Sequence, residues 1–187
     1  MVTEVARRRF TAAVYRQMIA AGILGEDDRV ELIAGEIIEM SPIGVRHMNC
    51  LNQVAKRVGR CVGEDWLVSV QNPILLADDS QPQPDIAVIP DRGENAPLPV
   101  AGEVRLVVEV ADSSRNFDQQ VKLPLYAAAG IPEAWLFDLV GATVERHTGP
   151  VEGRYTLIAI AARGQTLAST VLPALAFPAS IIPHAES

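Results

Sequence analysis

Two carboxylates lie in segments where a charge is unexpected. Asp85 follows Pro84 and precedes an apolar run at 86–89, and Glu109 interrupts a second apolar run at 104–110. An unpaired charge buried in such a segment costs several kcal/mol. Each carboxylate therefore needs a cation, a proton or solvent. For Glu109 alone, an ion pair with Lys122 or an arginine is the simpler explanation, and an Asp after Pro is common at turns.

Taken together with Lys122, these carboxylates point to metal chemistry. If the two apolar runs are neighbouring antiparallel strands, the start of the first lies beside the end of the second. Asp85 and Glu109 then meet at one edge of a sheet. Oxygen ligands of this kind suit Mg²⁺ or Mn²⁺. Lys122 would orient or deprotonate a water, or neutralise charge on a phosphate.

The segment 118–129 is expected to be the helix that carries Lys122. Tyr126 lies one turn after the lysine, where it would either steady Lys122 or pack in the core. Pro124 removes one backbone hydrogen bond and is expected to kink this helix. We expect Lys122 at the exposed end of the site, so that its removal leaves the fold intact.

A second helix is predicted over 42–62, with Ser41 as its cap and Pro42 in its first turn. Its core-facing stripe follows helical spacing and consists of Leu51, Val54, Ala55, Val58, Cys61 and Val62. The opposite face is basic and has no acidic residue, with Lys56 and Arg60 expected to be exposed. These two residues, with Arg46 and His47 near the helix start, form either an ordinary solvated face or a phosphate-backbone contact.

The remaining segments alternate between helix and strand patterns. A helix over 11–22 has Thr11 as its cap, and 29–33 and 36–40 flank Ala34-Gly35 as a β-hairpin. Further strands are predicted at 66–71, 73–77, 133–138, 143–147 and 155–160. The apolar tail, 161–187, is expected to pack on the sheet or to contribute to a dimer interface.

Composition sets broad limits on function. A chain of 187 residues is most simply one domain, 1–187, with a core over about 10–160. The net charge of −7 argues against a broad nucleic-acid-binding surface. No apolar run approaches the ~18 residues that span a bilayer, so no membrane is expected and a cytoplasmic location is predicted. Cys50 and Cys61 lie about 16 Å apart along one predicted helix, too far for a disulfide.

The ordered motifs resemble the putative restriction endonuclease family, a branch of the PD-(D/E)XK nuclease-like superfamily. The resemblance extends over about residues 10–160. The matching motifs are the hairpin at 31–42 followed by His47, Pro84-Asp85, Glu109-Val110-Ala111, Lys122 with Tyr126, the segment 129–135, and Asp138. Each motif is weak by itself, but their order along the chain is specific.

This resemblance implies an α/β (α+β) domain with a mixed central β-sheet flanked by helices. It implies that Asp85, Glu109 and the backbone carbonyl of Val110 bind the metal, with Glu31 as a further carboxylate. The superfamily lysine usually stands two residues after the glutamate, where this chain has Ala111, and in this family the following helix supplies it as Lys122. The chain also has Asp112-Ser113-Ser114 where the family has Ser-Pro.

The expected activity is a Mg²⁺- or Mn²⁺-dependent endonuclease that acts on nucleic acid, with DNA as the expected substrate, in a homodimer. The alternative is a non-catalytic relative that binds nucleic acid or protein through the same scaffold. A third reading is a structural protein whose buried carboxylates are merely paired. The acidic charge favours the non-catalytic relative, and the intact set of Asp85, Glu109 and Lys122 favours the nuclease.

Overall fold

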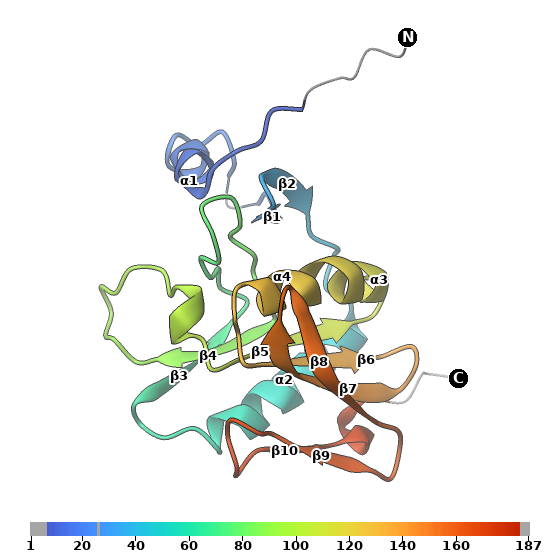
Figure 1. Cartoon of the computed structure of the whole chain (residues 1–187). Helices are drawn as coiled ribbons and strands as arrows, with labels where there is room; N and C mark the ends of the chain where they lie inside the picture. The colour runs from blue at the N-terminus through green and yellow to red at the C-terminus, as the bar shows by residue number, and fades with distance from the viewer. Residues whose placement is uncertain (1–6, 26, 184–187) are drawn as a thin grey trace.

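The computed structural model describes residues 7–25 and 27–183, which fold around one six-stranded sheet (Figure 1). Its strands lie side by side in chain order, and only β5 and β6 are parallel. The strands are β3 (Trp66–Val70), β4 (Ile86–Pro90), β5 (Leu106–Ala111), β6 (Glu133–Asp138), β7 (Thr143–Val151) and β8 (Arg154–Ala161). The parallel pair needs a crossover, which a helical segment between β5 and β6 supplies. The predicted mixed sheet of an α+β domain is confirmed.

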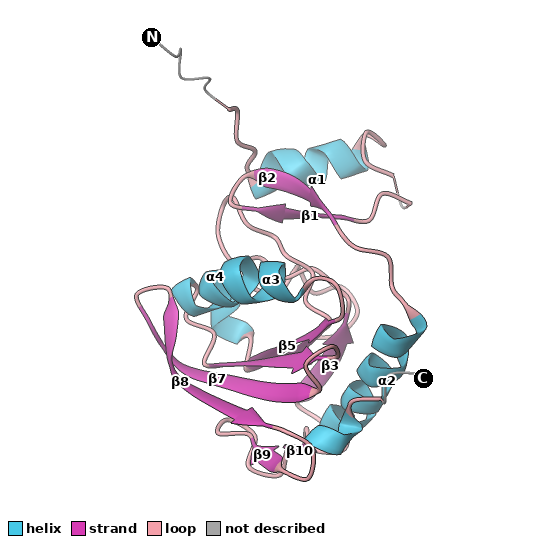
Figure 2. Ribbon diagram, turned by 90° about the vertical axis from the view of Figure 1, so that its right-hand side faces the viewer, coloured by secondary structure: helices cyan, strands magenta, loops and turns pink. Residues whose placement is uncertain are grey.

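Helices cover both faces of this sheet (Figure 2). On one face, helix α2 (Val45–Gly59) packs its buried Val54 and Val58 into a core that includes Trp135 and Phe137. On the other face, the helical crossover contributes Leu123 and Tyr126 to a second core. The two cores separate because successive side chains of a strand point to opposite faces.

The helical crossover consists of three consecutive parts. These are α3 (Arg115–Phe117), a π-helical turn (Asp118–Lys122) and α4 (Leu123–Ala128). Pro124 lies in the first turn of α4. A proline ring crowds the carbonyl four residues earlier, here in Gln120, and removes one backbone donor. We attribute the π-helical turn, which is wider than an α-helical turn, to this proline. The π-helical turn ends at Lys122, and α4 follows directly.

A β-hairpin and α1 (Ala12–Ala20) form a small layer at the N-terminal end of the molecule (Figure 1). Strands β1 (Val30–Ile33) and β2 (Glu36–Glu39) pair as predicted. Ala34 and Gly35 have φ of 49° and 80°, the conformation of a type I′ turn. Gln81 N donates to Leu32 O at 2.7 Å, so the hairpin docks on the segment that leads into β4.

Thr11 caps α1 as predicted, because its hydroxyl accepts from Val14 N. The predicted start of α2 is wrong. Its N-cap is Gly44, and Ser41 and Pro42 lie outside the helix. The reason is that Met40 N donates to Arg29 O and Arg29 Nη1 donates to Ser41 O. These bonds hold the chain beside the hairpin as far as Ser41, so the helix begins later.

Other details of α2 match its sequence pattern, and one predicted strand does not form. Leu51, Val54 and Val58 are buried, whereas Lys56 and Arg60 are exposed. Cys61 is only partly buried. The predicted strand 73–77 is wrong. This segment makes only isolated bridges, Leu75 with Val100 beside the short helix η1 (Ala101–Glu103), and Ala77 with Ser80.

The C-terminal segment returns to the face that α2 covers. It forms β9 (Thr166–Ala168), β10 (Ala176–Pro178) and η3 (Ala179–Ile181). The ring of Phe177 makes edge contacts with Trp135 and Phe137, at centroid distances of 4.8 and 5.0 Å. The buried apolar side chains of this segment therefore complete the core of their own chain. No helix among residues 7–25 and 27–183 is long and apolar enough to cross a membrane.

Candidate active site

A cavity of about 460 Å³ opens at the end of the sheet where β4 begins and β5 ends. Asp85 and Glu109 both line it. The predicted antiparallel pairing of β4 with β5 is confirmed, with Ile86 opposite Val108, so the next pair outward is Asp85 and Glu109. The β1–β2 hairpin, the start of α2 and the helical crossover supply the remaining walls.

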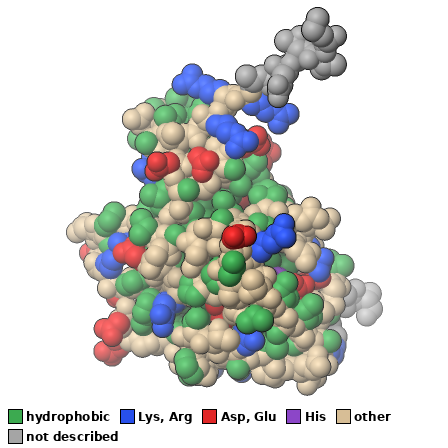
Figure 3. All heavy atoms as spheres, in the orientation of Figure 1, with side chains coloured by type: hydrophobic (Ala, Val, Ile, Leu, Met, Phe, Trp, Pro, Cys, Tyr) green, Lys and Arg blue, Asp and Glu red, His purple; other side chains and the backbone are tan. Residues whose placement is uncertain are grey.

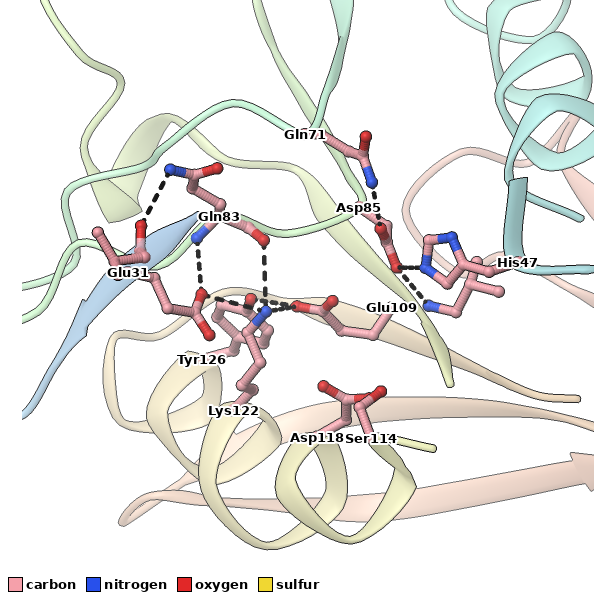
Figure 4. A network of polar contacts seen from close by, with 12 residues as sticks. Glu31, His47, Gln71, Gln83, Asp85, Glu109, Ser114, Asp118, Lys122 and Tyr126 are labelled. Atoms are coloured by element: carbon pink, nitrogen blue, oxygen red, sulfur yellow. Dashed lines mark hydrogen bonds and ion pairs between the residues drawn. The ribbon is translucent and has the colours of Figure 1, made fainter. Parts of the chain in front are cut away.

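Lys122 is at the centre of a buried ion-pair network (Figure 4). Its Nζ lies 3.0 Å from Glu109 Oε1 and 3.3 Å from Glu31 Oε2, and it donates to Gln83 O at 3.3 Å. These three acceptors match the three donors of an ammonium group. Lys122 is only 4% exposed, so the expectation of an exposed lysine is wrong. Burial lowers the pKa of Lys122, but Glu109, Glu31 and Asp118 outweigh it, and the lysine stays charged.

Glu109 shares one oxygen between two donors. Lys122 and the hydroxyl of Tyr126 both approach Oε1. Tyr126 therefore supports the carboxylate rather than the lysine. Burial raises the pKa of Glu109 to about 8, against the opposing charge of Lys122, and Asp118 and Asp85 add to the rise. Its other oxygen, Oε2, has no hydrogen-bond partner among the described residues.

Asp85 is held by a separate set of partners (Figure 4). Its Oδ2 lies 2.9 Å from His47 Nε2 and accepts from Val110 N at 2.8 Å, and its Oδ1 accepts from Gln71 Nε2 at 3.1 Å. Burial raises the pKa of Asp85, but the hydrogen bond and charge of His47, with the Val110 and Gln71 donors, bring it below the ordinary value. Asp85 is therefore ionised at neutral pH.

His47 is in the first turn of α2, where it faces the same carboxylate. Burial lowers its pKa, but the hydrogen bond to Asp85 and the charges of Asp85, Asp118 and Asp112 outweigh burial and raise the pKa overall. Its Nδ1 is buried and has no hydrogen-bond partner among the described residues. His47 thus belongs to the site as the partner of Asp85.

The donor set fits a hard divalent cation in its chemistry. Asp85 and Glu109 supply carboxylate oxygens, and Oε2 of Glu109 is unpartnered in the described part of the chain. The N–H and C=O of one strand residue point to the same edge, so the Val110 carbonyl faces the side where its N–H meets Asp85. No group of three or more His, Cys, Asp or Glu side chains in the described ranges could hold a metal. The expected metal ligands include only two such side chains, those of Asp85 and Glu109, because the third ligand is the backbone carbonyl of Val110.

Sequence reasoning missed three residues that shape this site. Asp118 is buried at 4% exposure, lines the cavity and accepts from Ser114 Oγ at 2.6 Å. Burial raises the pKa of Asp118, against the charge of Lys122. Its position four residues before Lys122 was the available signal, since such pairs are neighbours on a helix. Gln71 and Gln83 reach the site through folding alone.

The predicted nucleic-acid-binding residues divide into two groups. Arg46 lies beside His47, but its guanidinium donates to Leu139 O at 2.8 Å and lies 3.7 Å from Asp112 Oδ1. Lys56 and Arg60 come 9 and 13 residues after His47, which places them about 14 and 20 Å further along α2. Neither lines the cavity. The structure therefore brings Glu31, Asp85, Glu109, Lys122 and His47 together and leaves Lys56 and Arg60 apart.

Comparison with known proteins shows the family and the fold. Residues 13–180 match the model of the Uma2 family, described as "Putative restriction endonuclease". A similar solved structure is that of a putative nuclease belonging to DUF820 from Anabaena variabilis ATCC 29413. It has 14% sequence identity and a TM-score of 0.72, over 92% of this chain and 97% of that one. No curated protein matches the sequence significantly. At this identity the structural likeness shows the fold, and it confirms the predicted fold class.

Proposed function

This chain belongs to the Uma2 family of putative restriction endonucleases, and from that premise we propose that it is a metal-dependent endonuclease acting on DNA. The reaction is hydrolysis of a phosphodiester bond. The observation that carries the proposal is the meeting of Asp85, Glu109 and Lys122 in one cavity at one end of the sheet. These three residues come from separate segments of the chain, and ordinary core packing gives no reason to bury them together.

Asp85, Glu109 and the Val110 carbonyl would hold a Mg²⁺ or Mn²⁺ ion. When bound, such an ion supplies Lewis-acid polarisation of the scissile phosphate. Three residues prepare these ligands. His47 and Gln71 fix the carboxylate of Asp85, and Tyr126 fixes that of Glu109. Fixed ligands of this kind need little rearrangement at the moment of reaction.

Lys122 supplies a positive charge that the chain itself holds in the cavity. Its raised pKa keeps it protonated, so a role in removing a proton from water is disfavoured. An ammonium group instead stabilises negative charge that develops on phosphate oxygens. Lys122 Nζ already has three oxygen partners, so contact with a phosphate requires exchange of one of them. The neutral Gln83 carbonyl, at 3.3 Å, is the weakest of the three.

The alternative function is a non-catalytic relative that binds nucleic acid or protein. Two observations favour it. The chain carries a net charge of −7, and Lys122 Nζ already lies 3.0 Å from the same Glu109 carboxyl group that a metal would need. Both functions use the same cavity, so only a measurement of cleavage separates them.

Nicking of supercoiled plasmid DNA in Mg²⁺ or Mn²⁺ tests the proposal. We expect the wild-type protein to nick the plasmid, EDTA to abolish nicking, and Asp85→Asn to lower the rate by about 10²-fold or more. Asp65→Asn, at an exposed position, is the matched control and should retain the full rate. A wild-type protein without EDTA-sensitive cleavage of DNA or RNA would leave the non-catalytic function.

A further inference from the structure

The groups of the candidate site are almost fully buried in the wall of the cavity. The side chains of Glu31, Glu109 and Lys122 are at most 5% exposed, and that of Asp85 is 12% exposed. A volume of about 460 Å³ is in the range of small-ligand pockets. A double helix does not fit into such a space. The burial of these groups favours a phosphodiester whose strand has left the duplex or has no partner strand.

The cavity continues into a second hollow of about 340 Å³. Five of its six lining residues also line the first: Arg29, Met40, Ile43, Gln71 and Gln83. The two hollows are therefore adjacent. The exposed Arg29 lines both hollows, and its Nη1 donates to Ser41 O at 3.3 Å. Two adjacent hollows give room for more than one nucleotide of a strand.

Phe117 lines the cavity without belonging to the core. It ends α3, directly before Asp118, and it is partly exposed. Phe117 belongs to none of the three hydrophobic clusters of the described residues. The other phenylalanines do, since Phe10 packs in the N-terminal cluster, and Phe137 and Phe177 pack in the core under α2. Ile43, which is 40% exposed, lines the same cavity. An aromatic side chain beside a phosphate-binding site is a platform for a nucleobase, since every base has a face that stacks.

The net charge of −7 also disfavours binding of a duplex. On the face shown in Figure 3, Lys and Arg side chains are scattered among Asp and Glu side chains. Several Lys and Arg side chains lie close together only near the N-terminal end of that face. Glu39 and Asp112 line the cavity and would repel additional phosphates. Contact with many phosphates is what gives duplex-binding proteins their affinity. Stacking requires no such surface.

We propose that the site accepts an unpaired strand, as a single strand or a strand end, and that Phe117 stacks on the base next to the bound phosphate. This inference rests on the proposed nuclease function and specifies its substrate class. Phe117 is then a specificity-determining residue, and Arg29 contacts a neighbouring phosphate of the same strand. A blunt duplex is a poor ligand.

Binding measured without cleavage tests the inference. The probes are a fluorescein-labelled 12-nucleotide single strand, the same strand with abasic sites at its centre, and a blunt duplex, all in EDTA. Fluorescence anisotropy gives Kd for the wild type, Phe117→Ala, Phe117→Trp and the control Val151→Ala, a half-exposed residue outside the cavity. Circular dichroism verifies that each variant is folded, which we expect because Phe117 is outside the clusters.

We expect the single strand to bind at least tenfold more tightly than the duplex. Phe117→Ala should weaken single-strand binding by about fivefold or more. Phe117→Trp and Val151→Ala should bind as the wild type does, and abasic sites should weaken wild-type binding but not that of Phe117→Ala. Equal affinity for the duplex, unchanged binding by Phe117→Ala, or no binding to any probe would overturn the inference. EDTA-sensitive cleavage of the same single strand in Mg²⁺ or Mn²⁺ scores the nuclease function separately, so single-strand binding without cleavage would reject only that function.

Discussion

At the scale of single residues, the central feature is a lysine surrounded by acids. Lys122 has two carboxylates and one carbonyl as partners, and Asp118 is close enough to affect its pKa. Removal of one member of a buried ion pair leaves an uncompensated charge, which typically costs about 3–5 kcal/mol. Lys122 therefore contributes to stability as well as to the proposed chemistry, and substitutions must be chosen with both in mind.

Lys122→Met tests the lysine with the least change in volume. We expect cleavage of plasmid DNA to fall by about 10²–10³-fold, because one preorganised charge near the phosphate is lost. We also expect a lower Tm, since Glu31 and Glu109 lose their cation. Cleavage rate and circular dichroism melting, measured on the same preparation, separate the two effects. A folded variant with unchanged rate would exclude Lys122 from the chemistry.

The raised pKa of Glu109 predicts that the stability of the protein depends on pH. Its pKa is about 8 in the folded chain, against an ordinary 4.5, so the folded chain holds a proton there that the unfolded chain has lost. The stability from this group is complete below about pH 4.5 and disappears as the pH rises through about 8. In EDTA, the Tm of the wild type should therefore fall between pH 5 and pH 8.5. Glu109→Gln has no such proton, and its Tm should fall less.

Glu64→Gln, at an exposed position, is the control for this substitution and should follow the wild type. A Glu109→Gln protein whose Tm falls as steeply as that of the wild type would show that Glu109 is ionised in the folded chain throughout this range. The raised pKa would then be wrong. Cleavage by Glu109→Gln should be lost in either case, because the carboxylate is an expected metal ligand.

At the scale of elements, the β4–β5 register and the hairpin turn position the site. The sequence predicts both, because apolar runs define β4 and β5 and Ala34-Gly35 matches a two-residue turn. The sequence does not predict the direction of the side chains. Glu109 points to Lys122 and Tyr126, whereas Asp85 points to His47, and these partners come from distant segments (Figure 4).

The errors at this scale have tertiary causes. Ser41-Pro42 is a good local signal for a helix start, but backbone bonds to Arg29 keep the chain extended there. The segment 73–77 has strand composition but lacks a continuous neighbour. Pro124 predicts that its helix is distorted. It does not predict that the distortion is a π-helical turn. Local patterns therefore identify elements and leave their ends and partners open.

Gly35→Ala tests the contribution of the hairpin. Gly35 has φ +80°, and a Cβ there would lie 2.6 Å from Arg9 Cβ. Gly93 has φ +77° with nothing within 4 Å, so Gly93→Ala bears the same backbone strain without the contact. We expect Gly93→Ala to lower the free energy of unfolding by about 1–2 kcal/mol, and Gly35→Ala to lower it further. Urea denaturation measures both, and equal losses would show that the contact with Arg9 has no effect.

At the scale of the whole molecule, the predicted homodimer stays a prediction. The C-terminal tail does not offer the expected interface, because Leu175, Phe177 and Ile182 are buried in their own chain. The edge strand β8 is the alternative, since it exposes apolar side chains and no charged residue lies between Arg154 and Arg163. Unprotected edges of this kind favour pairing with another chain.

Light scattering coupled to size-exclusion chromatography checks this prediction. We expect a mass twice the 20.1 kDa of one chain. Ile158→Lys should convert the protein to monomers, whereas Val140→Lys, also at an exposed apolar position but off the edge strand, should not. A wild-type protein that elutes with the mass of one chain at high concentration would contradict the homodimer.

Anomalous diffraction from crystals soaked in Mn²⁺ tests the central claim, a metal-dependent active site, most directly. We predict one strong peak at the end of the sheet, in contact with Asp85, Glu109 and the Val110 carbonyl. We further predict that Lys122 moves away from Glu109 Oε1 and keeps its contact with Glu31. A crystal without a peak at these residues, with the Lys122–Glu109 ion pair intact at millimolar Mn²⁺, would contradict the metal-dependent site.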